Sequence, residues 1–98
     1  MIRISVYKQG SDVLIGACDE KLLGKTFSEG KFHLHVSKKF YGGQSISLQA
    51  LGHYLKEATI ANLVGEKAVQ CAIQLGLIDA ANVITIQGIP HAQMVRML

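Results

Sequence analysis

The sequence predicts an α+β domain, with a mostly antiparallel sheet of about five short strands and two main helices packed on one face. The first half alternates apolar and polar residues with a period of two, which is typical of strands, and the second half spaces its apolar residues as helices do. The chain has 98 residues, of which 49% are hydrophobic and 17% charged. This length suits one hydrophobic core, so we expect residues 1–98 to form a single domain.

The first half contains three candidate strands. Residues 2–7 alternate between apolar and polar side chains, which indicates a strand with one buried face. A turn at residues 10–12 leads into the apolar run 13–18, which we expect to be the second strand of a hairpin, central and covered on both faces. Residues 32–36 alternate again and predict a third strand. Residues 19–30, which precede it, are expected to form a loop or a short helical turn.

Two helices are predicted after this region. Ser47 is placed to cap the first of them, whose apolar stripe runs through residues 48–58. The second is expected from about Ile60 to Leu75, with Gly76 as its left-handed C-terminal residue. The apolar face of this helix is broad and its polar face is narrow. This pattern predicts burial on more than one side, either within the domain or in a dimer interface.

Two short strands, at residues 83–87 and 94–98, are expected to flank a turn stiffened by Pro90, the only proline of the chain. This turn carries an imidazole, His91, and a carboxamide, Gln93, which a bare connection does not need. The turn is therefore a candidate site.

A second polar group lies near the start of the predicted long helix. Asn62 and Glu66 are four residues apart and would share one helix face. Gly65 between them indicates a close approach to the backbone, by a packed element or by a ligand. With His91 and Gln93, these two residues form our candidate polar site, in which a carboxylate and an imidazole could transfer protons if they converge. No catalytic residue is assigned, because no nucleophile or oxyanion arrangement accompanies them.

The excess positive charge belongs entirely to the first half. Residues 1–49 carry seven basic and four acidic side chains, whereas residues 50–98 carry three of each, and the net charge is +3. Such an asymmetry can attract nucleic-acid phosphates, and it is also compatible with an ordinary solvated surface. Tyr41, beside Phe40 and two glycines, could stack on a base or close the end of the core. The candidate nucleic-acid contacts are Lys25, Lys31, His33, His35, Lys38, Lys39 and Tyr41.

Other chemical interpretations fail on spacing. Residues 24–26 resemble the end of a phosphate-binding loop, but the required first glycine is replaced by Asp19. His33 and His35 share a strand face without a third ligand, so we expect no metal and no cofactor. Cys18 and Cys71 lie in separate apolar runs and are expected to be free thiols.

Membrane insertion and export are not expected either. No apolar stretch approaches the roughly 20 residues of a membrane helix. Residues 1–5 lack a signal-peptide layout, so we expect a cytoplasmic protein without a membrane partner.

Several blocks, in the same order, resemble one small archaeal family. They are residues 18–19, 23–27, 40–43, 61–66 and 88–93. Together they are similar to the family catalogued as domain of unknown function 424, and the likeness covers nearly the whole chain. The resemblance implies an archaeal, cytoplasmic, stand-alone domain, and it brings no activity or catalytic residues.

Three functions remain open at this point. The first is a non-catalytic RNA-binding or translation-associated module, whose partner is RNA or a ribonucleoprotein. The second is a small enzyme or ligand-binding protein that uses Asn62, Glu66 and His91. The third is a homodimeric scaffold that buries the second side of the long helix.

Overall fold

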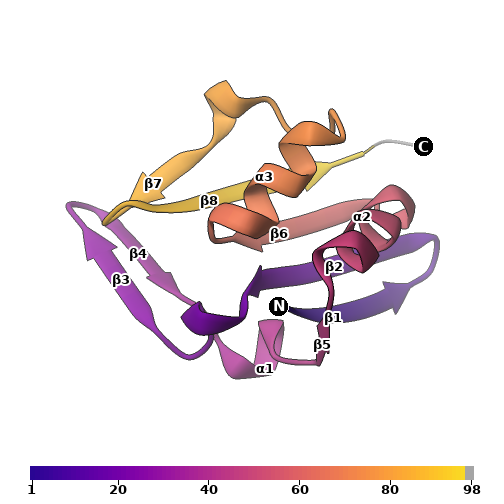
Figure 1. The fold of residues 1–98 in the computed structure, drawn as a ribbon, viewed down its shortest axis with the longest axis horizontal. Coiled ribbons are helices and arrows are strands. Elements are labelled where there is room, and N and C mark those ends of the chain that lie inside the picture. The colour runs from indigo at the N-terminus through magenta and orange to yellow at the C-terminus, as the bar shows by residue number, and fades with distance from the viewer. Residues whose placement is uncertain (97–98) are drawn as a thin grey trace.

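The computed structural model describes residues 1–96 and is built around a six-stranded sheet (Figure 1). Neighbouring strands pair antiparallel, except β2 and β6, which run parallel. The order across the sheet is β5 (Gln44–Ile46), β1 (Ile2–Gln9), β2 (Asp12–Asp19), β6 (Ile60–Val64), β8 (Ile89–Val95) and β7 (Ile84–Ile86). The first two predicted strands thus form the expected hairpin, and β2 lies inside the sheet.

Two helices, α2 (Leu48–Glu57) and α3 (Glu66–Gln74), cover one face of this sheet (Figure 1). The Ser47 side chain accepts a hydrogen bond from the Ala50 N–H at 3.1 Å, which is the predicted cap. Gly76 follows α3 with a φ of 73°, the left-handed conformation expected there. Within residues 1–96, no helix has the length and apolar character needed to cross a membrane. The helices share one hydrophobic core with the strands beneath them. The fully buried residues of this core include Ile2, Ile4, Ile15, Leu51, Leu55 and Leu63.

The opposite face of the sheet is covered only in part. Strands β3 (Thr26–Glu29) and β4 (Phe32–His35) pair with each other in a separate hairpin, and the short helix α1 (Lys38–Tyr41) follows them. Figure 1 shows this hairpin beside β7, extending away from α1. Side chains from these elements and from the back of the sheet form a second core, made of Cys18, Leu22, Leu34, Val36, Tyr41, Val64 and Ile86.

The predicted helix from Ile60 to Leu75 is wrong in its first third. Residues 60–64 form β6, and the helix begins only at Glu66, after Gly65 has turned the chain with a φ of 107°. Strand β6 has apolar residues at four of its five positions, all except Asn62, so its sequence lacks the alternation that would distinguish a strand from a buried helix. Asn62 and Glu66 accordingly do not share a helix face.

The prediction of about five strands is also too low, since residues 1–96 contain eight. Residues 19–30, expected to be a loop or helical turn, contain a short 3₁₀ turn at Glu20–Leu22 and the strand β3.

The predicted turn, residues 88–93, overlaps the observed one only at Gly88. Pro90 lies within β8, and the reversal is made by Gln87 and Gly88, with φ angles of 52° and 78°. These values are typical of a two-residue hairpin turn. Of the strand predicted at residues 94–98, residues 97–98 lie outside the described part of the chain.

Candidate functional site

Four exposed lysines surround the β3–β4 hairpin and α1. Lys31 lies in the turn at the tip of the hairpin, Lys25 lies at its base, and Lys38 and Lys39 open α1. Within residues 1–96 the one ion pair joins Arg3 to Glu20, so none of these lysines is ion-paired with a carboxylate. We call Lys25, Lys31, Lys38 and Lys39 the lysine cluster.

Two histidines lie on the exposed side of the same hairpin. His35 Nδ1 is hydrogen-bonded to Thr26 Oγ1 at 2.8 Å, and His33 Nδ1 is hydrogen-bonded to Ser28 Oγ at 2.9 Å. Each bond joins directly opposed residues of the two strands and orients one imidazole while using only one ring nitrogen. In the described part of the chain, no three histidine, cysteine or carboxylate side chains are grouped as a metal site requires.

Tyr41, the aromatic residue proposed from the sequence, lies in the second core. Its side chain is only 6% exposed, and burial, together with the neighbouring Cys18, raises the pKa of its hydroxyl to about 12. The structure therefore favours the alternative in which Tyr41 closes the end of the core. Its ring face is not free to stack on a base, and Tyr41 is not part of the surface considered below.

A different aromatic pair lies beside the lysine cluster. The rings of Tyr7 and Phe40 stack with centroids 5.4 Å apart and planes 15° from parallel. The Tyr7 hydroxyl donates to the Phe40 carbonyl at 2.8 Å, and Tyr7 remains 39% exposed. The Phe40 ring lies over Gly16, where a Cβ would come within 2.5 Å of it. Tyr7 was not among the residues proposed from the sequence. The available signal was Gly16, because a glycine inside a buried strand indicates that another group, here the Phe40 ring that stacks on Tyr7, lies close to the backbone.

The structure brings together three of the four residues of the candidate polar site. Asn62 and Gln93 are directly opposed across β6 and β8, and Gln93 Nε2 donates to Asn62 Oδ1 at 2.8 Å. His91 is two residues from Gln93 and therefore points to the same face of the sheet. Glu66 lies in the first turn of α3, on the other side of the sheet, and lines a groove with Leu48. Burial lowers the pKa of His91.

The close approach predicted at Gly65 is made by a carboxylate. Asp19, at the end of β2, accepts hydrogen bonds from the N–H groups of Lys67 and Ala68 at 3.0 and 2.9 Å. It thereby caps α3 from another strand, and it is only 4% exposed. A Cβ at Gly65 would lie 2.5 Å from the Asp19 Cγ, which explains the glycine. This contact supports the fold and leaves no free anion site at the helix start.

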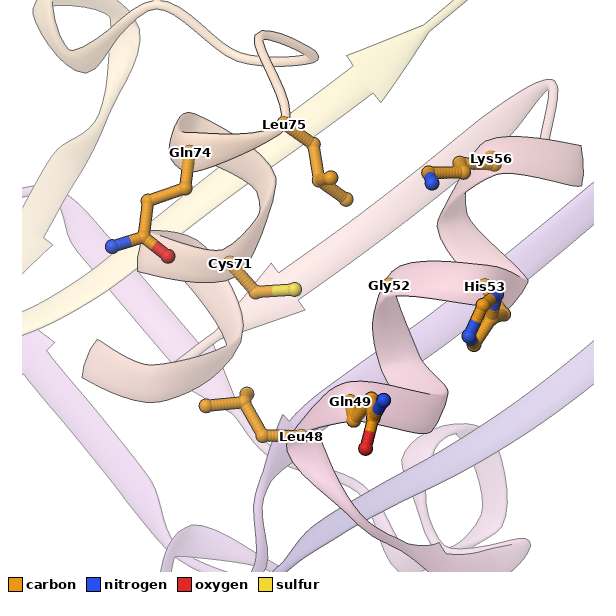
Figure 2. A pocket seen from close by; sticks show the side chains of 8 residues that line it. All are labelled: Leu48, Gln49, Gly52, His53, Lys56, Cys71, Gln74 and Leu75. Atoms are coloured by element: carbon orange, nitrogen blue, oxygen red, sulfur yellow. The ribbon is translucent and has the colours of Figure 1, made fainter.

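Both cysteines are free thiols. Cys18 is buried in the second core, and burial, followed by the neighbouring Asp19, raises its pKa to about 11. Cys71 lies on α3, and Figure 2 shows its sulfur directed into the groove between α2 and α3. This groove has a volume of about 400 Å³, with Leu48 and Leu75 at its margins. It contains none of the residues proposed as a site from the sequence.

Comparisons with known proteins identify a family but no activity. A family model described as "Protein of unknown function (DUF424)" matches residues 7–97. The fold is similar to that in a crystal structure of an uncharacterized conserved protein from Methanopyrus kandleri, with a TM-score of 0.75 and 25% sequence identity. That similarity covers 99% of this chain and 95% of the other. No curated protein matches the sequence.

Proposed function

We propose that this chain, which belongs to the DUF424 family as its sequence blocks indicated, is a non-catalytic RNA-binding module. The lysine cluster would contact the phosphates of an RNA strand, free or within a ribonucleoprotein. The observation that carries the proposal is the local charge. Residues 20–43 contain five lysines and two glutamates, an excess of three that equals the net charge of the whole chain.

The two glutamates of this segment are already engaged. Glu20 lies 3.8 Å from an Arg3 guanidinium nitrogen and accepts a hydrogen bond from Ser45 at 3.0 Å. Glu29 accepts a hydrogen bond from the Gln87 N–H at 2.6 Å, which joins the hairpin to the β7–β8 turn. Neither carboxylate is paired with a lysine of the cluster, although both charges remain and are included in the net excess of three.

The surroundings of the cluster favour a single strand of nucleic acid. Exposed imidazoles on β4 and the accessible Tyr7 ring add groups that can stack on unpaired bases. If all four lysines contact phosphates, the logarithm of the binding constant should fall with the logarithm of the salt concentration with a slope of about −3. The expected affinity is therefore strongly salt-dependent.

The proposal is tested by fluorescence anisotropy with labelled single-stranded RNA over a series of salt concentrations. Lys38→Gln with Lys39→Gln should weaken binding and make the salt slope shallower by about 1.4, at about 0.7 per lost contact. The matched control is Lys56→Gln with Lys67→Gln, which removes the same charge from the helix-covered side. Absence of binding at low salt, or equal loss in both variants, would reject the proposal.

The two other functions receive less support. Asn62 and His91 lack the carboxylate partner that the enzyme hypothesis required, because Glu66 lies on the other side of the sheet. The dimer hypothesis relied on a long helix that is apolar on more than one side. Without residues 60–64, the exposed positions of α3 are Glu66, Lys67, Gln70 and Gln74, all of them polar.

A further inference from the structure

The sheet face opposite α2 and α3 has an uncovered area between α1 and the end of β8. Strand register places Gly16, Asn62 and Gln93 side by side on this face. The Phe40 ring covers Gly16, while Asn62 is half-buried and Gln93 is exposed. The polar side chains of Asn62 and Gln93 therefore lie next to the area that the Phe40 ring covers.

The amide pair has unused hydrogen-bonding capacity. The bond from Gln93 Nε2 to Asn62 Oδ1 uses one N–H and one oxygen. It leaves the Asn62 amide nitrogen as a donor and the Gln93 Oε1 as an acceptor on two neighbouring side chains. Proteins read the donors and acceptors on nucleobase edges with asparagine and glutamine amides.

The residues around the pair suit a flat, partly apolar ligand with a negative backbone. Ile60 and Val95 lie directly opposite each other next to the pair, and Val95 is 71% exposed. The positions of β6 and β8 on this face carry no carboxylate; they are Ile60, Asn62, Val64, Ile89, His91, Gln93 and Val95. On the other side, Phe40 directly follows Lys39 of the lysine cluster, and the Tyr7 hydroxyl bonds to both of their carbonyls.

From this juxtaposition we infer that Asn62, Gln93 and the Tyr7–Phe40 pair bind an unpaired nucleobase. The amides would contact the edge of the base, and the aromatic pair would contact a base by stacking. The inference rests on the proposed function, because it assigns base contacts to the strand whose phosphates lie on the lysine cluster. Lysines and amides then have separable roles, since phosphates carry affinity and base edges carry preference.

The test measures anisotropy with labelled decamers of A, C or U, and with an abasic decamer of the same charge. The wild-type protein should prefer one base, and it should bind the abasic strand more weakly than any of the others. Gln93→Ala, at an exposed position, should reduce the preference by about twofold to tenfold, as expected for loss of one neutral hydrogen bond to the base edge. Gln70→Ala, exposed on α3, is the matched control and should leave the preference unchanged.

Stacking is tested separately with Tyr7→Leu, which keeps the site apolar and should weaken every base-containing decamer while leaving the abasic strand unaffected. Asn62→Ser serves as a second amide variant, accepted only if its urea midpoint matches that of the wild type. The lysine variant should change the salt slope but not the preference.

Failure of the inference and failure of the proposed function give different results. Binding that depends on the lysines but is equal for the three bases and the abasic strand overturns the base site alone. An unchanged preference in Gln93→Ala does the same. Absence of RNA binding at low salt overturns both.

Discussion

Replacing Gly65 by alanine is expected to destabilise the protein through two separable effects. Gly65 has φ 107° and ψ 157°, a conformation that is essentially restricted to glycine, so an alanine there costs about 1–3 kcal/mol. The new Cβ would also lie 2.5 Å from the Asp19 Cγ and 2.7 Å from its Oδ1. The carboxylate must then leave the Lys67 and Ala68 N–H groups, and loss of this cap costs about another 0.5–2 kcal/mol.

The second effect depends on Asp19, which makes it measurable by a double-mutant cycle. Asp19→Ala should cost about 0.5–2 kcal/mol for the same cap, because it leaves the Lys67 and Ala68 N–H groups without their acceptor. In the double variant the cap is lost only once, and the Cγ and Oδ1 clashes are absent. The remaining contact is with the Asp19 Cβ, at 2.8 Å. The double variant should therefore be more stable than the sum of the two changes predicts, by about 0.5–2 kcal/mol, the cost of the cap that each single change removes.

Urea unfolding followed by circular dichroism measures each free energy, provided that the slope with denaturant stays constant. Gly76→Ala is the matched control, because Gly76 also has a positive φ, of 73°, but a Cβ there would meet nothing within 4 Å. It should lose about 1 kcal/mol and combine additively with Asp19→Ala. If Gly65→Ala combined additively with Asp19→Ala too, the contact between Asp19 and Gly65 would not explain the glycine.

Two further predictions follow from pKa shifts. Because burial lowers the pKa of His91, the unfolded chain binds more protons, so stability should fall as the pH drops below the ordinary value of 6.5 and level off below the folded value. His91→Gln should remove this part of the pH dependence when urea unfolding is measured at about pH 7.5 and about pH 5.5. An unchanged pH dependence in this variant would contradict the assignment. Iodoacetamide should label Cys71 in the folded protein and Cys18 only after unfolding, since Cys18 is buried and its pKa is raised to about 11. Mass spectrometry after digestion distinguishes the two labelled cysteines. Equally fast labelling of both would refute the packing of the second core.

Sequence reasoning identified the elements whose conformation is determined by residues close to them in the chain. The β1–β2 hairpin follows from alternation and a glycine turn, and α2 follows from its Ser47 cap and apolar stripe. Strand β6 was missed because its conformation depends on parallel pairing with β2, more than forty residues earlier in the chain. The β7–β8 turn was predicted at residues 88–93, later in the chain than observed, because Gln87, unlike asparagine or glycine, does not signal a positive φ.

In the candidate site, too, some properties could be predicted from the sequence and others depended on contacts between distant residues. Exposure of the lysines could be predicted, because long charged side chains are seldom buried. The roles of Tyr41 and Tyr7 could not, since they depend on which ring meets the second core and which meets Phe40. The pairing of Asn62 with Gln93 required strand register, which joins residues 31 positions apart.

That register explains why a proline lies beside the candidate site. Pro90 has no N–H, so any register that requires a donor at residue 90 loses a hydrogen bond. In the observed register Pro90 contributes its carbonyl, which accepts from the Gly65 N–H at 2.9 Å where β6 ends. A shift of one residue would turn Gln93 to the helix-covered face and replace it with Ala92 or Met94, which are now buried there. Pro90 and Gly65 thus act together through geometry alone: they favour the alignment in which the Asn62 and Gln93 amides meet on the open face.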